Sequence, residues 1–393
     1  MLGVRDPFHR AQLAIAALFC FLGFQYATWA SRLPAIRTRL DLSEAELGLL
    51  LMACGAGAAV SFPLVTVLMR RLGSRRLAFL SAICLSLLLL ALAAAPNYPV
   101  ALVAICCDGV AVGCLNVAMN AQGAALEATF RRTAMSRLHA TFSAGSLFAA
   151  LLASGVNIVT TEVAVHFGVA SVLLLLLVGL TRSGLLADDL SGAEKETPKE
   201  SRRRLTMPSR VTIWMGCAMV FGTVTEGAMN DWSALYLKDV AGASAQLAPM
   251  GIAVVSVMMV LARLFADGWR SRWGDGRIVK AGSAVAGAGL ALALLAGGTV
   301  PALIGFACVG LGVAAVTPCV YVAAAGQGTR ALSLVAAMGT TGLLAGPAVI
   351  GFIANANGLV WGMGAVAASA LLVSLCATRI RWPGRAEPEP IPS

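Results

Sequence analysis

The sequence contains few charged residues. Only 12% of its 393 residues are Asp, Glu, Lys or Arg, whereas 59% are hydrophobic and the mean hydropathy is +0.83. An average soluble domain carries about a quarter charged residues. The charges that are present lie in short clusters between long apolar stretches. This composition excludes a water-soluble single core and predicts a chain that crosses a membrane several times.

The sequence also lacks the motifs of several functional classes. It has no Gly-x-x-x-x-Gly-Lys-Ser/Thr loop for ATP phosphates and no nucleophile motif. Its three histidines and ten cysteines show no metal-ligand spacing, and the cysteines fall in apolar stretches as small buried side chains rather than disulfides. The net charge of +10 comes without a basic helix or an aromatic and basic face. We therefore expect no enzyme activity, no metal, no cofactor and no nucleic-acid partner.

Long apolar runs dominate the rest of the sequence. A helix needs about 20 mostly apolar residues to cross a bilayer. The first run is longer than a signal-peptide core and is followed by Arg32-Leu-Pro, so we expect it to be a retained span. The sequence predicts an all-α membrane protein with twelve transmembrane helices, at 11–31, 47–69, 77–95, 100–126, 137–158, 164–182, 210–235, 247–268, 279–297, 301–326, 331–354 and 358–378.

The distribution of Lys and Arg predicts the orientation. With both termini on one side, 24 of the 29 basic residues fall on that side, and only Arg32, Arg37, Arg39 and Lys238 on the other. Cytoplasmic segments are enriched in Lys and Arg. We therefore expect a multi-pass protein of a bacterial-type inner membrane with both termini in the cytoplasm.

The sequence divides into two similar parts. A charged stretch follows the sixth span, and residues 43–73 match residues 244–274 at an offset of 201. Residues 136–145 align on 333–342 at an offset of 197. Two like-oriented repeats of six spans are typical of a parallel-repeat transporter. The expected units are a first half at 1–186, a cytoplasmic linker at 187–209, a second half at 210–380 and a tail at 381–393.

Several motifs resemble those of the major facilitator superfamily. The loop after the second span, Arg70-Arg-Leu-Gly-Ser-Arg-Arg76, is similar to that family's Gly-x-x-x-Asp-Arg-x-Gly-x-Arg-Arg motif, with Arg70 in place of the acid. In the second half, Arg263, Asp267, Arg272 and Gly274 resemble the variant of fucose-permease-like members. The resemblance covers essentially the whole chain and implies a secondary transporter.

Two further segments resemble the fucose-permease-like branch. Gly113-Cys-Leu-Asn116 in the fourth span is similar to a Gly-Cys-Leu-Glu motif of sugar:proton symporters, with Asn116 at the position of the acid. Glu226-Gly-Ala-Met-Asn230-Asp231-Trp232 in the seventh span is similar to an acid-then-aromatic pattern there. The resemblance implies proton-coupled transport of a sugar-like solute.

Polar groups inside the predicted spans are candidates for the site, because they are costly in a bilayer. Asn116 and Asn120 share a helix face, where they either line a cavity or form interhelical hydrogen bonds worth about 0.6 kcal/mol each. Trp29 either stacks on a sugar ring or belongs to an interfacial aromatic belt. The residues expected to bind solute are Gln25, Trp29, Asn116, Asn120, Asn230 and Tyr321.

The acid expected to couple protons is Glu226, with Asp108 as the other candidate. Ala30 and Asn116 occupy the positions where the family has acids in spans one and four, so another group must titrate. Glu226 lies one helical turn from Asn230 on the same face. The alternative is a neutral Glu226 carboxyl hydrogen-bonded to a neighbouring helix.

Four charged residues are expected to act in gating. Asp267 should approach the start of the fifth span, where free backbone N–H groups favour a carboxylate, and Arg263 should orient it. Arg32 and Asp231 lie at the outer ends of the first spans of the two halves and should form an ion pair when the outer side closes.

We expect a monomeric secondary transporter that moves a small polar, sugar-like solute by alternating access, coupled to protons. Proton-driven efflux of amphipathic compounds is an alternative that an apolar cavity lined by Met and Phe would favour. A non-transporting membrane sensor or scaffold is the third class. It would be expected to carry an appended soluble domain.

Overall fold

The computed structural model describes residues 6–132, 134–181, 184–186 and 209–382, without the side chains of residues 136, 267 and 329. Within these ranges the chain is all-helical and contains no strand. The helices are α1 (Pro7–Ala30), α2 (Leu33–Leu40), α3 (Glu44–Ala94), α4 (Tyr98–Phe130), α5 (Met135–Val159), α6 (Val163–Thr181), α7 (Arg210–Asp239), α8 (Met250–Trp273), α9 (Asp275–Ala296), α10 (Thr299–Val313), α11 (Val316–Ala325), α12 (Thr329–Asn357) and α13 (Leu359–Ala377).

These helices confirm the predicted all-α membrane fold. In the described part of the chain, ten helices are long and apolar enough to cross a bilayer, and Met250–Ala266 of α8 is a shorter apolar helix. α3 holds two spans, because Gly73 adopts φ 73° and ψ 168° between them. Only glycine takes this conformation without strain. With α10 and α11 forming one span, Thr299–Ala325, the number of spans is twelve.

Side-chain caps set the first residues of several helices. Asp6 accepts a hydrogen bond from the Phe8 N–H at the start of α1. Two hydrogen bonds hold the pKa of the Asp6 carboxyl below its usual value: the larger effect comes from His9 and the smaller from the Phe8 N–H. At the start of α3, Ser43 and Glu46 form a reciprocal capping box. Such caps satisfy the free N–H groups at a helix start.

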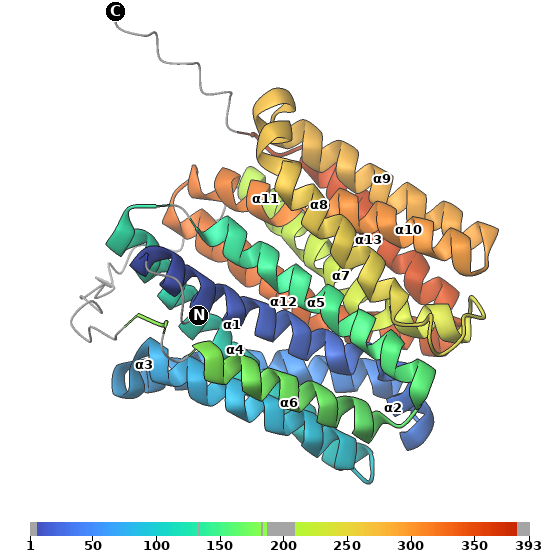
Figure 1. Ribbon diagram of the computed structural model, residues 1–393. Helices are drawn as coiled ribbons and strands as arrows, with labels where there is room; N and C mark the ends of the chain where they lie inside the picture. Colours follow the sequence, from blue (N-terminus) through green and yellow to red (C-terminus); the bar gives the residue numbers. More distant parts are fainter. Residues whose placement is uncertain (1–5, 133, 182–183, 187–208, 383–393) are drawn as a thin grey trace, which may run out of the picture.

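The helices form two groups, α1–α6 and α7–α13, which we call the N-terminal and C-terminal halves (Figure 1). The halves touch where α3 packs on α12, α5 on α8 and α2 on α7. We call the end of the bundle where α1 begins the terminal end, at the left of Figure 1, and the opposite end the far end. The expected linker falls almost entirely, and the expected tail largely, outside the described residues.

Polar contacts fasten the two halves to each other at the far end. The Arg37 guanidinium of α2 bonds Asp239 of α7 at 2.8 Å and Glu44 at 2.7 Å. Asn157 of α5 donates to the carbonyl of Ala245 at 2.7 Å. The far end is therefore closed in this structure.

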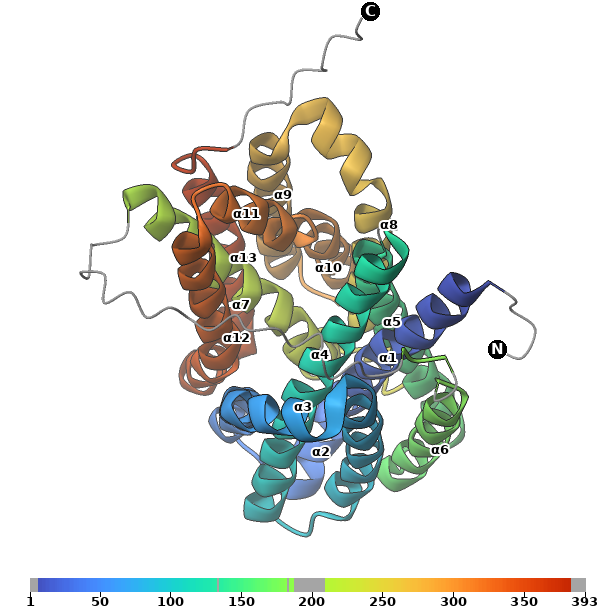
Figure 2. The same ribbon diagram turned by 90° about the vertical axis from the view of Figure 1, so that its left-hand side faces the viewer.

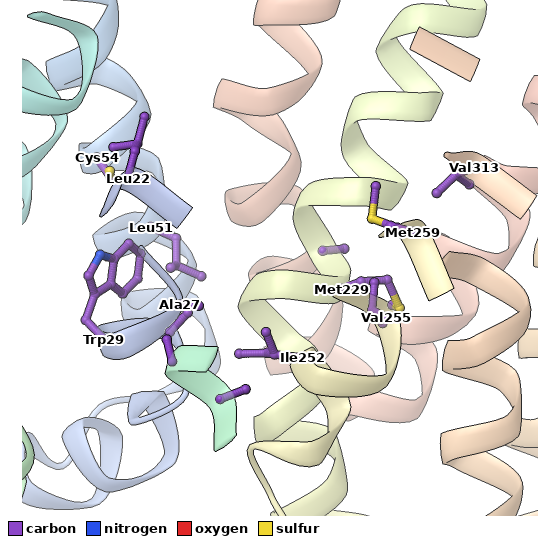
Figure 3. Packing of buried hydrophobic residues seen from close by; sticks show 14 of the residues in the cluster. Leu22, Ala27, Trp29, Leu51, Cys54, Met229, Ile252, Val255, Met259 and Val313 are labelled. Carbon is purple, nitrogen blue, oxygen red and sulfur yellow. The ribbon is translucent and has the colours of Figure 1, made fainter. Parts of the chain in front are cut away.

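Buried apolar side chains fill the space within each half. Figure 3 shows Trp29 of α1 beside Leu51 of α3, and Met229 of α7 close to Val255 and Met259 of α8. All five side chains are buried. Lipid tails are as apolar as these side chains, so close van der Waals contact stabilises the helix pairs more than loss of water does.

Glycines allow α3 and α4 to approach backbone to backbone. A Cβ placed on Gly109 of α4 would lie 1.8 Å from the carbonyl oxygen of Cys54. A Cβ on Gly57 of α3 would likewise lie 2.0 Å from the carbonyl oxygen of Cys106. No side chain fits between these helices without moving one of them.

We expect Gly109→Ala to destabilise the N-terminal half by about 1–3 kcal/mol, the usual range for overpacking. The measurement is the apparent Tm of the purified protein in detergent. Gly168→Ala on α6 is the matched control, because a Cβ there meets no atom within 4 Å. Equal Tm values for the two variants would show that the α3–α4 contact is not tightly packed.

Candidate functional site

A hydrogen bond joins the two halves between the last turns of α1 and α7. The Tyr26 hydroxyl of α1 donates to Oδ1 of Asp231 on α7. Asp231 is 2% exposed, and it forms no ion pair with any residue that the structure describes. The Tyr26 ring also packs edge-on against Trp29, with ring centroids 4.8 Å apart. The Tyr26 side chain therefore bonds a buried carboxyl of the C-terminal half and packs on Trp29 of its own half.

The neighbouring residue on α1 holds a second buried acid. Gln25 donates from Nε2 to Oδ1 of Asp108 on α4 at 2.7 Å. Both side chains are buried, at 0% and 3% exposure. Gln25 Oε1 and Asp108 Oδ2 have no hydrogen-bond partner. The pair is incompletely satisfied, which is costly in a dry interior.

A third polar group links α5, α7 and α8. Arg263 of α8 contacts Oε1 of Glu226 on α7 at 3.2 Å and donates to Oγ of Ser143 on α5 at 2.7 Å. Glu226 and Arg263 are each partly exposed. Ser143 belongs to the N-terminal half and the two charged residues to the C-terminal half. The Arg263 guanidinium therefore contacts Glu226 in its own half and Ser143 in the opposite half.

The amides predicted on α4 lie on an open face of the helix. Asn116 is exposed and Asn120 is half-buried. Asn120 donates from Nδ2 to the side-chain oxygen of Asn116 at 2.9 Å. On α7, Asn230 donates to the backbone carbonyl of Glu226 at 3.2 Å. Tyr321 is half-buried on α11, and its hydroxyl forms no hydrogen bond with any residue that the structure describes.

Trp29 lies in a different environment from the one that stacking on a solute requires. Its side chain is 1% exposed and packs inside the N-terminal half (Figure 3). Its indole N–H has no partner. In this structure the ring supports Tyr26 rather than facing an open surface.

The expected ion pair between Arg32 and Asp231 is not present among the described residues. Arg32 instead donates from Nη2 to the carbonyl of Thr161 at 2.6 Å. Asp231 is occupied by Tyr26. The physical reason is that the α5–α6 connection offers Arg32 a backbone acceptor, whereas Asp231 lies deeper, among buried residues of α7.

An acid of α4 accepts hydrogen bonds from the backbone at the start of α5. Glu127 of α4 accepts hydrogen bonds from the N–H groups of Ala134 and Met135, at 2.6 and 2.8 Å. These are the donors that Asp267 was expected to use. The Asp267 side chain lies outside the described residues, so the latch through Asp267 stays a prediction. Arg263, which was expected to orient it, contacts Glu226 and Ser143. Glu127 lies only a short connection away along the chain, which places its carboxylate within hydrogen-bond distance of these N–H groups.

Sequence analysis missed Tyr26 and Ser143. Tyr26 directly follows Gln25, and its hydroxyl is one of few in the apolar run of α1. Ser143 lies in the 136–145 segment that repeats at 333–342. Neither signal identifies a partner, because both partners lie on α7 or α8, in the other half of the sequence.

An apolar cavity of about 320 Å³ lies between α8, α9 and α10. Figure 2 shows α8 and α9 at the top of the view. The cavity lining includes Trp269, Trp273 and Val285, and Arg277 is the only charged side chain among the lining residues that the structure describes. All lining residues belong to the C-terminal half.

Comparisons with known proteins agree with this architecture. The family model described as Major Facilitator Superfamily matches residues 13–328. An uncharacterised MFS-type transporter of Yersinia pestis is 33% identical over 383 residues, which cover 94% of this chain and 95% of the relative.

Two solved structures share the fold. A mutant of the nucleoside transporter NupG superimposes with a TM-score of 0.73 at 16% identity, covering 95% of this chain and 99% of the other. A D-xylose-proton symporter superimposes with a TM-score of 0.68 at 17% identity, covering 95% and 97%. At these identities the likeness shows the fold alone.

We expect Tyr26→Phe to loosen the contact between α1 and α7, because it removes the hydroxyl that bonds Asp231. A hydrogen bond of this kind is worth about 1 kcal/mol, which corresponds to roughly a fivefold shift toward an open far end. The measurement is the labelling rate of a reporter cysteine at Ala245, in a background without the native cysteines.

The control variant is Tyr98→Phe. The Tyr98 hydroxyl donates to the carbonyl of Glu46 at 3.2 Å within the N-terminal half. Equal labelling rates in the two variants would show that the Tyr26 bond does not hold the far end closed.

Proposed function

Because the chain belongs to the major facilitator superfamily, we propose that this multi-pass transporter moves a small polar, sugar-like solute across a bacterial inner membrane by alternating access, driven by protons. The observation that carries the proposal is a pair of polar contacts that join the two halves, one between α1 and α7 and one between α8 and α5. The Tyr26–Asp231 and Arg263–Ser143 bonds both cross from one half to the other. In transporters built from two repeats, the solute binds between the repeats, so side chains from both halves can contact it.

The open face of α4 supports a polar solute. Asn116 is exposed although it lies near the centre of a spanning helix. An amide at that depth is stable where it faces a water-filled cavity, because lipid offers it no hydrogen bonds. Its donor and acceptor groups suit the hydroxyls of a sugar-like molecule.

The distribution of basic residues makes the terminal end the cytoplasmic side. The far end is then the outer face, and its closure corresponds to a state in which solute exchanges with the cytoplasm. The Arg37–Asp239 pair and the Asn157–Ala245 bond would have to separate for solute to bind from outside.

The Arg263 contacts support Glu226 as the coupling acid. The Arg263 guanidinium lies 3.2 Å from Glu226 Oε1, close enough for an ion pair. The bond to Ser143 holds Arg263 in place from the opposite half. Movement of α5 relative to α8 would break the Arg263–Ser143 bond and change the surroundings of Glu226.

Efflux of amphipathic compounds is the second candidate function. The apolar cavity between α8, α9 and α10 is the observation in its favour. That cavity lies inside one half, so rocking the halves does not move it from one side of the membrane to the other. Its position therefore supports a polar solute in preference to an amphipathic one.

The test of the function is transport by the full chain in proteoliposomes. We expect an inward proton gradient to drive accumulation of one or more radiolabelled sugars, sugar acids or nucleosides, and Asn116→Ala to reduce it at least tenfold. Asn97→Ala at the start of α4 is the control outside the site. Gradient-driven export of hydrophobic dyes, without uptake of any polar solute, would favour the efflux candidate instead.

We expect Glu226→Gln to abolish uphill accumulation while leaving exchange of solute across the membrane intact. Glutamine keeps the shape and hydrogen bonding but cannot titrate. Ser143→Ala should lower the accumulation ratio severalfold, because Arg263 then loses its tie to the N-terminal half. Asp108→Asn is the comparison variant, and normal accumulation in Glu226→Gln with loss in Asp108→Asn would transfer the coupling role to Asp108.

A further inference from the structure

A second cavity, of about 510 Å³, lies at the far end between the two halves. The N-terminal half contributes the α1–α2 turn and the α5–α6 connection, and the C-terminal half contributes Lys238 and the loop with Ala245 and Ala248. These segments gather at the right of Figure 1. The cavity is separate from the Tyr26–Asp231 and Arg263–Ser143 contacts described above.

Three buried polar atoms without a hydrogen-bond partner belong to residues that line this cavity. They are Ser31 Oγ, Arg32 Nε and Asn157 Oδ1. The three residues are 3%, 3% and 5% exposed. Leaving one such atom unpaired costs about 1–3 kcal/mol. Three of them around a single cavity indicate that its contents form hydrogen bonds, with an acceptor for Arg32 and a donor for Asn157.

The charges around the cavity favour an anion. Arg32, Arg39 and Lys238 line it together with a single acid, Glu162. Arg39 donates to the backbone carbonyls of Ala93 and Leu92, which fixes its charge at the cavity wall. Lys238 forms no ion pair with any residue that the structure describes. The lining therefore carries two more positive than negative charges.

We propose that this cavity binds a small hydroxylated organic anion, of the sugar-acid class, at the outer face of the transporter. The acid group is placed toward Arg32 and Lys238, and a hydroxyl donates to Asn157 Oδ1. Inorganic anions such as chloride would neutralise the positive charge of the lining, but they have no hydrogen-bond donor for Asn157 Oδ1. Both requirements together select a molecule with a carboxylate and hydroxyl groups.

The site exists only while the far end is closed, because Lys238 and Ala245 come from one half and Arg32 and Asn157 from the other. A ligand that binds one state shifts the equilibrium toward it. An anion bound here therefore stabilises the closed far end and slows its opening. This effect is separate from binding of the transported solute and from proton coupling.

The direct test is isothermal titration of the full chain in phosphatidylcholine nanodiscs with glucuronate, and with glucose as the uncharged probe of similar shape. We expect glucuronate to bind at least fivefold more tightly than glucose. Lys238→Gln should weaken glucuronate binding about fivefold and leave glucose unchanged. Lys280→Gln removes the same charge from α9 outside the cavity, and it should change neither.

A cavity-filling variant tests the location. Ala164 is exposed and lines the cavity, whereas the next residue, Val165, is 49% exposed and does not. Ala164→Phe should abolish glucuronate binding, and Val165→Phe should preserve it. These measurements require no transport, so the proposed function can fail without affecting them.

Three results would overturn the proposal. Equal affinity for glucuronate and glucose would remove the charge selectivity. Glucuronate binding that is unchanged in both Lys238→Gln and Ala164→Phe would place the ligand elsewhere. Loss of glucuronate binding in phosphatidylglycerol nanodiscs would identify a lipid headgroup, rather than a soluble anion, as the occupant.

Discussion

The lack of hydrogen-bonding solvent inside a bilayer is the constraint on which the rest of this structure depends. Backbone groups there must bond within their own segment, which restricts the spans to helices. Polar side chains face the same requirement, and they meet it by pairing across helices or by facing a cavity. Gln25 with Asp108, and Tyr26 with Asp231, are pairs of the first kind. Asn116 is exposed, and its side chain accepts a hydrogen bond from Asn120 of the same helix.

The same constraint sets how helices contact each other within and between the two halves. Within a half, glycines such as Gly57 and Gly109 bring backbones into direct contact over several turns. Between the halves, the polar connections are single hydrogen bonds or ion pairs at particular points, such as Tyr26–Asp231 and Arg37–Asp239. Each of these is worth about 1 kcal/mol and exchanges readily with water or solute. The halves also pack closely where α3 meets α12, because a Cβ on Gly351 would lie 2.6 Å from the carbonyl oxygen of Glu44.

Arg263 joins the two halves next to a charged group. It belongs to the C-terminal half, contacts Glu226 in that half, and donates to Ser143 in the other. A change in the distance between the halves therefore changes the surroundings of a carboxylate without any long relay. Residues of both halves likewise line the far-end cavity. In both places, groups of the two halves meet at one polar site.

The sequence alone determined the spans of this protein. The twelve apolar runs coincide with the helices to within a few residues, because the length and apolarity of a span are local properties set by bilayer thickness. Gly73 between the second and third spans was visible in the same way. The candidate polar residues could also be picked out, since any polar group in an apolar run is conspicuous.

Only the tertiary structure decided which of these residues meet. The sequence predicted a pair between Arg32 and Asp231, whereas the fold places Arg32 on Thr161 and Tyr26 on Asp231. The sequence also did not predict the contacts of Arg263 with Glu226 and Ser143. These partners depend on the rotation of each helix about its axis and on which helices are neighbours. Both are set by close packing between segments up to about half the chain apart, which no local pattern of residues records.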